Sequence, residues 1–149
     1  TCVGWEKLEW SSKSARLPYK GMQIDFGGIV KEYAVDFASQ IIRDFRIESA
    51  LVDLSGDLSV IGSKPNGLPW EISIKHPRRA DSSSAIMKLV DVAVATSGDY
   101  ERSFILNGKR YSHMLNPKTG WPSDGFASCT VISKQCLIAG GTATASLLK

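Results

Sequence analysis

Apolar side chains recur at helical spacing after Gly27 and Gly28, and charged and amide side chains stand mostly between them. Residues three or four positions apart lie on one face of a helix, so this pattern predicts a long amphipathic helix near the N-terminus. A second helix, rich in small residues, is predicted from Cys136 to Lys149. The expected apolar face of the first helix comprises Val30, Ala34, Phe37, Ala38, Ile41 and Phe45.

Most of the remaining chain shows short apolar or alternating runs, which are typical of β-strands. Asn107 and Gly108 separate two such runs, and this pair favours a hairpin turn because both residues accept a positive φ. Residues 1–20 are expected to be irregular, with Trp5 and Trp10 as packing anchors. The pattern as a whole predicts an α+β fold with a mostly antiparallel sheet. The expected strands are Met22 to Phe26, Ala50 to Leu54, Leu58 to Ile61, Trp70 to Lys75, Val90 to Thr96, Glu101 to Leu106, Lys109 to Leu115 and Ser128 to Ser133.

The composition narrows the possible functions. A chain of 149 residues, 43% hydrophobic and 22% charged, is long enough for one domain and has an ordinary soluble composition. Its formal net charge of +3 suits phosphate-bearing ligands but not a dedicated nucleic-acid binder. Its apolar runs are too short to span a bilayer. The three cysteines and two histidines have no spacing that is typical of a zinc site.

Two glycine-containing turns are candidates for ligand binding. Gly27 and Gly28 precede the long helix, where free N–H groups attract anions; a tight turn without a ligand is the commoner alternative. Asp53 and Asp57 flank Ser55 and Gly56, and they are interpreted either as ligands for a metal or ribose or as hairpin-turn acids.

Three further segments carry polar groups that could serve chemistry. The apolar run ending in Thr96, Ser97, Gly98 and Asp99 stops where sheets often expose functional side chains, although turn chemistry also explains it. His113 lies beside a Pro- and Gly-rich loop and is either a base or a structural group. The basic run KHPRR at residues 75–79 could contact phosphate, but a solvated loop is the commoner alternative because no aromatic residues are interleaved with it.

Taken together and in order, five segments resemble the ApbE family, the FAD:protein FMN transferases. The resemblance runs from about Met22 to Leu148 and corresponds to the central and C-terminal part of the family's domain. It therefore implies one flavin-binding domain over residues 1–149, as a fragment without the family's N-terminal portion. The segments are IDFGGIVKEYAVD (24–36), DLSGD (53–57), ATSGDYERSF (95–104), GKRYSHMLNPKTGWP (108–122) and LIAGGTATASLL (137–148).

The resemblance implies an activity and its partners. Family members bind FAD and Mg²⁺, cleave the pyrophosphate, and transfer FMN to a threonine of an acceptor flavoprotein. They are found in the periplasm or cell envelope, so peripheral membrane association through an anchor N-terminal to these residues is also implied. In-line transfer of this kind needs a positioned phosphate, a cation and a base.

The resemblance also assigns roles to individual residues. His113 corresponds to the general base, and the Val30 main-chain carbonyl and the Thr144 hydroxyl correspond to metal ligands. The positions that correspond to the flavin nucleotide site are Gly27, Gly28, Lys31, Ser55, Gly56, Asp57, Thr96, Ser97, Gly98 and Asp99.

One departure from the family pattern concerns the metal. Gly140 stands where the family usually has the aspartate that is the main carboxylate on Mg²⁺; Asp57 and Asp99 are other acids that could compensate, although the sequence does not show that they do. A catalytically impaired FAD-binding module is therefore an alternative to the transferase. A third reading makes the chain a flavin acceptor, modified on Thr142 or Thr144.

Overall fold

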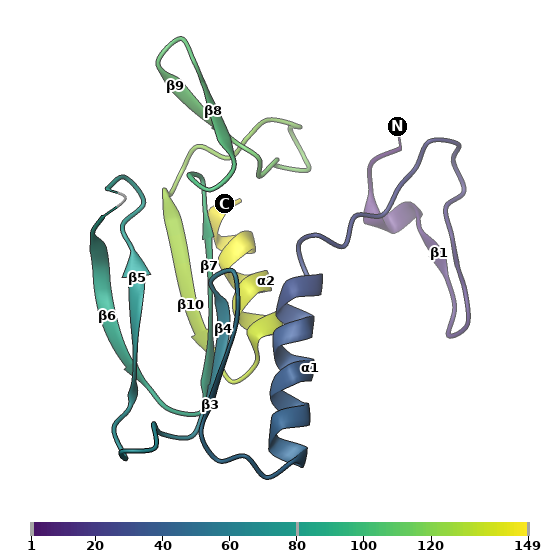
Figure 1. The fold of residues 1–149 in the computed structure, drawn as a ribbon. Helices are drawn as coiled ribbons and strands as arrows, with labels where there is room; N and C mark the ends of the chain where they lie inside the picture. Colours follow the sequence, from purple (N-terminus) through teal and green to yellow (C-terminus); the bar gives the residue numbers. More distant parts are fainter. Residues whose placement is uncertain (1, 80, 149) are drawn as a thin grey trace.

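The computed structural model describes residues 2–79 and 81–148 and has an α+β fold (Figure 1). Its centre is a four-stranded antiparallel sheet in the order β10-β7-β4-β3. Two helices, α1 and α2, contact strands of this sheet and each other. The bounds of these elements are α1 Val30–Asp44, β3 Ala50–Leu54, β4 Asp57–Ile61, β7 Val92–Gly98, β10 Ser128–Ser133 and α2 Cys136–Leu147.

The other elements form three short antiparallel hairpins and one turn of 3₁₀ helix. The β5–β6 hairpin is inserted between β4 and β7, and the β8–β9 hairpin lies between β7 and β10. The N-terminal segment contains the 3₁₀ turn and the β1–β2 pair. Their bounds are η1 Trp5–Lys7, β1 Glu9–Trp10, β2 Ala15–Arg16, β5 Trp70–Lys75, β6 Ser83–Leu89, β8 Ser103–Leu106 and β9 Lys109–Ser112.

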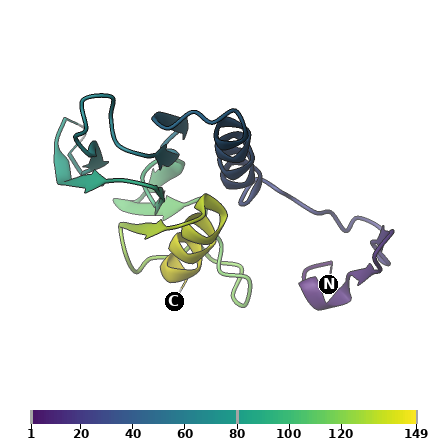
Figure 2. The same cartoon turned by 90° about the horizontal axis from the view of Figure 1, so that it is seen from below.

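Strand β7 divides the hydrophobic core into two layers. Successive side chains of a strand point to opposite faces, so Ala93 and Ala95 belong to one cluster and Val94 to the other. The first cluster joins the sheet to the helices through Val35 of α1 and Cys136 of α2. The second cluster packs the sheet against the β5–β6 hairpin (Figure 2). The sheet is therefore covered on both faces, with helices on one side and a hairpin on the other.

Several predictions about the elements are confirmed. The long helix begins at Val30, the Ala50–Leu54 and Ser128–Ser133 strands have the predicted bounds, and the whole fold is α+β with antiparallel pairing. Asn107 and Gly108 have φ values of +50° and +76° and form the predicted two-residue turn between β8 and β9. The C-terminal helix ends at Leu147. Thr1, the first residue of the segment predicted to be irregular, and Lys149, the last residue of the predicted second helix, lie outside the described residues.

The N-terminal segment departs from the sequence predictions. It extends away from both layers of the fold (Figure 2). Trp5 and Trp10 are 70% and 73% exposed, so neither is a packing anchor within the described chain. The predicted strand from Met22 to Phe26 is irregular, because its backbone joins no strand ladder among the described residues. The β6 strand had no prediction at all.

The buried face of α1 also differs from the predicted one. Glu32, Val35 and Ser39 are its buried residues, whereas Phe37 and Phe45 are 57% and 76% exposed. The sheet and α2 lie against the side of α1 that carries the shorter side chains. The larger apolar side chains therefore point outward and stay partly exposed, with the Phe37 ring stacked on that of Tyr33.

The two helices are connected by a side chain rather than by a local cap. Gln135, the residue before α2, makes no capping hydrogen bond with its side chain. Instead Asp36 of α1 accepts hydrogen bonds from the first two N–H groups of α2, those of Cys136 at 2.7 Å and Leu137 at 3.0 Å. A carboxylate at a helix N-terminus satisfies unpaired donors and interacts favourably with the helix dipole.

No helix within residues 2–79 and 81–148 has the length and apolar character that crossing a bilayer requires.

Candidate functional site

A cleft of about 750 Å³ brings together residues from both helices, the sheet and the loop after β9. Its volume lies in the range of small-molecule sites. The glycine turn before α1 and the loop that carries His113 line the same cleft, although they are far apart in sequence. The sequence-predicted residues that line it are Gly27, Gly28, Lys31, Ser55, Gly56, Asp57, Thr96, Ser97, Gly98, His113 and Thr144.

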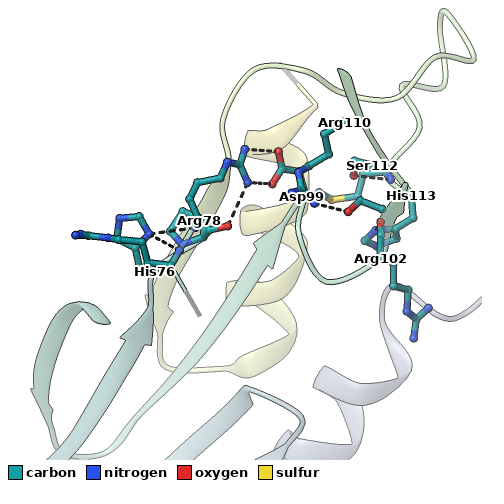
Figure 3. A network of polar contacts seen from close by, with 11 residues as sticks. His76, Arg78, Asp99, Arg102, Arg110, Ser112 and His113 are labelled. Carbon is teal, nitrogen blue, oxygen red and sulfur yellow. Dashed lines mark hydrogen bonds and ion pairs between the residues drawn. The ribbon is translucent and has the colours of Figure 1, made fainter. Parts of the chain in front are cut away.

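Two predicted site residues are placed elsewhere. Asp99 is not part of the cleft lining, because its carboxylate forms a two-pronged ion pair with the Arg78 guanidinium at 2.6 and 2.7 Å (Figure 3). This contact raises the pKa of Arg78, chiefly through the hydrogen bond to Asp99. The Val30 side chain is 53% exposed and lies outside the cleft, so the role of its main-chain carbonyl stays a prediction.

The basic run at residues 75–79 is a structured turn. His76 Nδ1 accepts hydrogen bonds from the backbone N–H groups of Arg78 and Arg79, at 3.0 and 3.2 Å (Figure 3). Arg78 then reaches across to Asp99 at the end of β7. The predicted solvated loop is therefore fixed to the sheet by an ion pair, and Arg78 is not free for an anionic ligand.

His113 is held in one orientation by the backbone of Arg102. The ring Nδ1 atom lies 3.0 Å from the Arg102 carbonyl oxygen, and the backbone N–H group of His113 donates to the same oxygen (Figure 3). A carbonyl can only accept, so Nδ1 carries the proton and Nε2 is left as the basic nitrogen. The imidazole is solvent-exposed at the edge of the cleft. Such a group can accept a proton from an incoming hydroxyl.

The glycine turn before α1 is partly occupied by a side chain of this chain. The Gly27 N–H group donates to Asp25 Oδ1 at 2.6 Å, so that donor is not available to an anion in this arrangement. A Cβ atom at Gly28, in contrast, would meet no atom within 4 Å. The open space at this turn therefore lies over Gly28, facing the cleft.

The two predicted aspartates beside the β3–β4 turn make different contacts. Ser55 and Gly56 have φ values of +56° and +90°, and Asp53 Oδ1 accepts the Gly56 N–H group at 2.8 Å. Asp53 is therefore the turn acid. Asp57 is 5% exposed and forms an ion pair with Lys31 Nζ at 2.5 Å on the cleft side of α1.

Glu32 is a cleft residue that the sequence analysis did not identify. It is 6% exposed, and its Oε2 atom has no hydrogen-bond partner among the described residues. Burial raises the pKa of Glu32, its own backbone N–H lowers it, and Asp57 raises it further. The sequence signal was a glutamate in the first turn of a helix, a position that alone is explained by the helix dipole.

Gly140 of α2 is the reason that Glu32 fits. A Cβ atom at position 140 would lie 2.5 Å from Glu32 Oε1 and 2.6 Å from Glu32 Cγ. Because real Cβ atoms do not make such contacts, a side chain at 140 and the Glu32 carboxylate cannot occupy this place together. The residue that departs from the family pattern is thus directly covered by a carboxylate from the other helix.

Hydroxyl groups connect α2 to the end of β7. The Ser97 Oγ and Thr144 Oγ1 atoms are 2.8 Å apart, and both residues line the cleft. Modification of Thr142 or Thr144 by flavin stays a prediction. Cys136 at the start of α2 is fully buried, and desolvation by burial raises the pKa of its thiol to about 12.

The donor set of the cleft fits a magnesium-type cation better than a closed metal cage. No group of three or more His, Cys, Asp or Glu side chains within residues 2–79 and 81–148 is arranged to hold a metal. Mg²⁺, however, commonly takes only one or two carboxylates and completes its shell with water and phosphate oxygens. The unpartnered Glu32 oxygen and the Thr144 hydroxyl are oxygen donors of that type in one cleft. Asp57 and Asp99, the other acids considered as substitutes for a carboxylate at 140, are both paired with basic side chains.

Comparison with known proteins gives one consistent result. A family model described as "ApbE family" matches residues 1–149. A FAD:protein FMN transferase of Vibrio cholerae serotype O1 is 35% identical over 139 residues, which cover 92% of this chain and 41% of that protein. One from Klebsiella pneumoniae is 37% identical over 133 residues, covering 87% and 40% respectively.

Two crystal structures are similar throughout this chain. The ApbE protein of Thermotoga maritima has a TM-score of 0.88 and 38% identity, covering 97% of this chain and 47% of that one. The apo form of the Pseudomonas stutzeri flavinyl transferase ApbE has a TM-score of 0.81 and 36% identity, covering 97% and 45%. The chain therefore spans less than half the length of the relatives it matches.

Proposed function

The chain belongs to the ApbE family, and from this premise we propose that its cleft holds FAD for transfer of FMN to an acceptor protein. One observation carries the proposal: segments distant in sequence, from the glycine turn at Gly28 to the loop at His113, line one cleft of about 750 Å³. The relatives are FAD:protein FMN transferases, and this activity names the substrate that such a cleft would take. The fold alone would not support a function without this site.

The chemistry assigned to this site is a phosphoryl-type transfer. The hydroxyl oxygen of an acceptor threonine forms a bond to the phosphorus of the FMN half of FAD. The bond between that phosphorus and the bridging oxygen breaks, and AMP leaves with the bridging oxygen. The hydroxyl proton passes to His113 Nε2, which the Nδ1 contact with Arg102 leaves as the acceptor nitrogen.

Other residues of the chain position the substrate in this proposal. Lys31 is half-exposed at the cleft, and its ammonium group provides positive charge for the pyrophosphate while Asp57 fixes its position. Thr96 and Ser97 supply hydroxyl groups at the end of β7. A divalent cation held by Glu32 and Thr144 would reduce the negative charge on the pyrophosphate.

A pair of glycine variants tests FAD binding. Cβ atoms at Gly28 and at Gly125 would each meet no atom within 4 Å, and neither residue has a positive φ, but only Gly28 lines the cleft. Gly28→Leu in the intact protein should therefore fold normally and bind FAD about tenfold more weakly or worse, which corresponds to about 1.4 kcal/mol. Gly125→Leu should bind FAD like the wild type. Flavin fluorescence titration measures both, and equal affinities for the two variants would contradict the proposed location.

A second candidate function is an FAD-binding module without transferase activity. Gly140 favours it, because that position provides no carboxylate for a cation. AMP release at saturating FAD, with an acceptor domain and Mg²⁺ present, separates the two functions. The transferase releases one AMP for each FMN attached to the acceptor, whereas the module binds FAD and releases none.

A further inference from the structure

The Glu32 carboxylate occupies an unusual position between the two helices. It is the third residue of α1, yet it is 6% exposed and lies against the backbone of α2 at Gly140. One of its oxygens, Oε2, has no hydrogen-bond partner among the described residues. Burying an oxygen of this kind without a partner is unfavourable, so a native structure that retains it calls for an explanation.

The charges around Glu32 do not balance. Two carboxylates, Glu32 and Asp57, lie at the inner wall of the cleft, and Lys31 is committed to Asp57 at 2.5 Å. When both acids are ionised, this group of three carries one uncompensated negative charge. An uncompensated buried charge is costly, and a bound cation is one of the few ways of compensating it.

The neighbouring donors suit a hard divalent cation. Gly140 and Thr144 are four residues apart on α2, so they lie on the same side of the helix about one turn from each other. The Glu32 side chain lies against Gly140, and Thr144 lines the cleft one turn further along α2. Carboxylate and hydroxyl oxygens, completed by water and phosphate, form a typical magnesium environment.

We propose that Glu32 is the carboxylate ligand of a divalent-cation site in the cleft, and that α1 thereby supplies the ligand for which position 140 of α2 has no side chain. The cation would meet the pyrophosphate of FAD, so the inference rests on the proposed function. The absence of a side chain at Gly140 then makes room for the Glu32 carboxylate. Replacing either residue alone should therefore disturb the cation site.

A purely structural role for Glu32 makes a different prediction. An acidic side chain in the first turn of a helix stabilises that helix through its dipole, whether or not a cation is present. Such a role would change the stability of a Glu32 variant and would leave cation binding unaffected. Cation affinity is therefore the readout that separates the two explanations.

Mn²⁺ titration of the intact protein tests the proposal, because the electron paramagnetic resonance signal of free Mn²⁺ disappears on binding. Glu32→Gln keeps the size of the side chain and should weaken Mn²⁺ binding by about tenfold to a hundredfold, because the site loses its charged ligand. Asp44→Asn, an exposed carboxylate change on the same helix outside the cleft, should bind like the wild type. Unchanged Mn²⁺ affinity in Glu32→Gln would overturn the proposal.

A ligand exchange between the helices provides a second, independent test. Glu32→Gly alone should lose Mn²⁺ binding, and the double variant with Gly140→Asp should regain it, since the carboxylate then comes from α2. Failure of a folded double variant to regain binding would count against a shared site.

FAD titration of the same samples distinguishes the two proposals. FAD binding by a wild-type protein that takes up no Mn²⁺, with or without FAD, overturns the cation site and leaves flavin binding standing. Mn²⁺ binding by a protein that does not bind FAD would overturn flavin binding and leave the cation site standing.

Discussion

The contact between Gly140 and Glu32 makes a quantitative prediction about stability that does not depend on any ligand. In Gly140→Ala the new methyl carbon would lie 2.5 Å from Glu32 Oε1 and 2.6 Å from Cγ. Turning the carboxylate alone does not relieve this clash, because Cγ is also too close, so the whole side chain must leave its buried place. Overpacking of this kind costs about 1–3 kcal/mol, and exposure of the unpartnered Glu32 Oε2 to water offsets part of that cost. Alanine gains about 1 kcal/mol over glycine in a helix, which leaves a net loss of about 0–2 kcal/mol.

The same substitution should have the opposite sign once Glu32 is shortened. In a Glu32→Ala background the clash is absent, so Gly140→Ala should stabilise the protein by about 1 kcal/mol. The double-mutant cycle therefore predicts a coupling of about 1–3 kcal/mol between the two positions. Urea unfolding of the four proteins without divalent cations measures it. Additive changes, with Gly140→Ala equally stabilising in both backgrounds, would refute the close contact between the helices.

Three further results are expected. His113→Gln should reduce FMN transfer by about 10²- to 10⁴-fold at saturating FAD while FAD affinity stays unchanged; a variant with full activity would remove His113 as the base. Cys136 is fully buried and its thiol pKa is raised to about 12, so at pH 8 maleimide should label exposed Cys2 and leave Cys136 unlabelled, as peptide mass spectrometry would show. Labelling of native Cys136 at the rate of Cys2 would contradict its burial. Asp36→Ala should cost about 1–2 kcal/mol in urea unfolding because α2 loses its cap, whereas Asp44→Ala on the exposed side of α1 should cost less than half as much.

Local sequence patterns were sufficient for the elements whose structure is set by local chemistry. The Asn107–Gly108 turn follows from the positive φ that both residues adopt, and α1 begins at Val30, two residues after Gly28. The same reasoning failed for Met22 to Phe26, where a strand-like run has no partner strand among the described residues. Strand formation depends on pairing, which a short run of residues does not encode.

The candidate site could be predicted only in part, because its chemistry depends on how the two helices meet. The resemblance assigned Gly28 to the flavin site and His113 to the base, and both residues line the cleft. The importance of Glu32 was invisible, because a glutamate in the first turn of a helix is usually solvent-exposed. Its burial follows from the close approach of α1 to Gly140, a contact between residues that are far apart in sequence. The position of Asp99 outside the cleft lining could not be predicted for a similar reason, since its partner Arg78 comes from the β5–β6 hairpin.

Attachment of flavin to an acceptor domain is the most direct measurement of what this cleft does. The intact protein is incubated with FAD, Mg²⁺ and a domain that contains a flavinylation threonine, and the acceptor is then weighed by intact-protein mass spectrometry. A mass increase equal to one FMN phosphoester, with an equal amount of AMP in solution, is the result expected if the cleft holds FAD for transfer. An acceptor of unchanged mass with every divalent cation tried, from a protein that binds FAD, would contradict the transferase function.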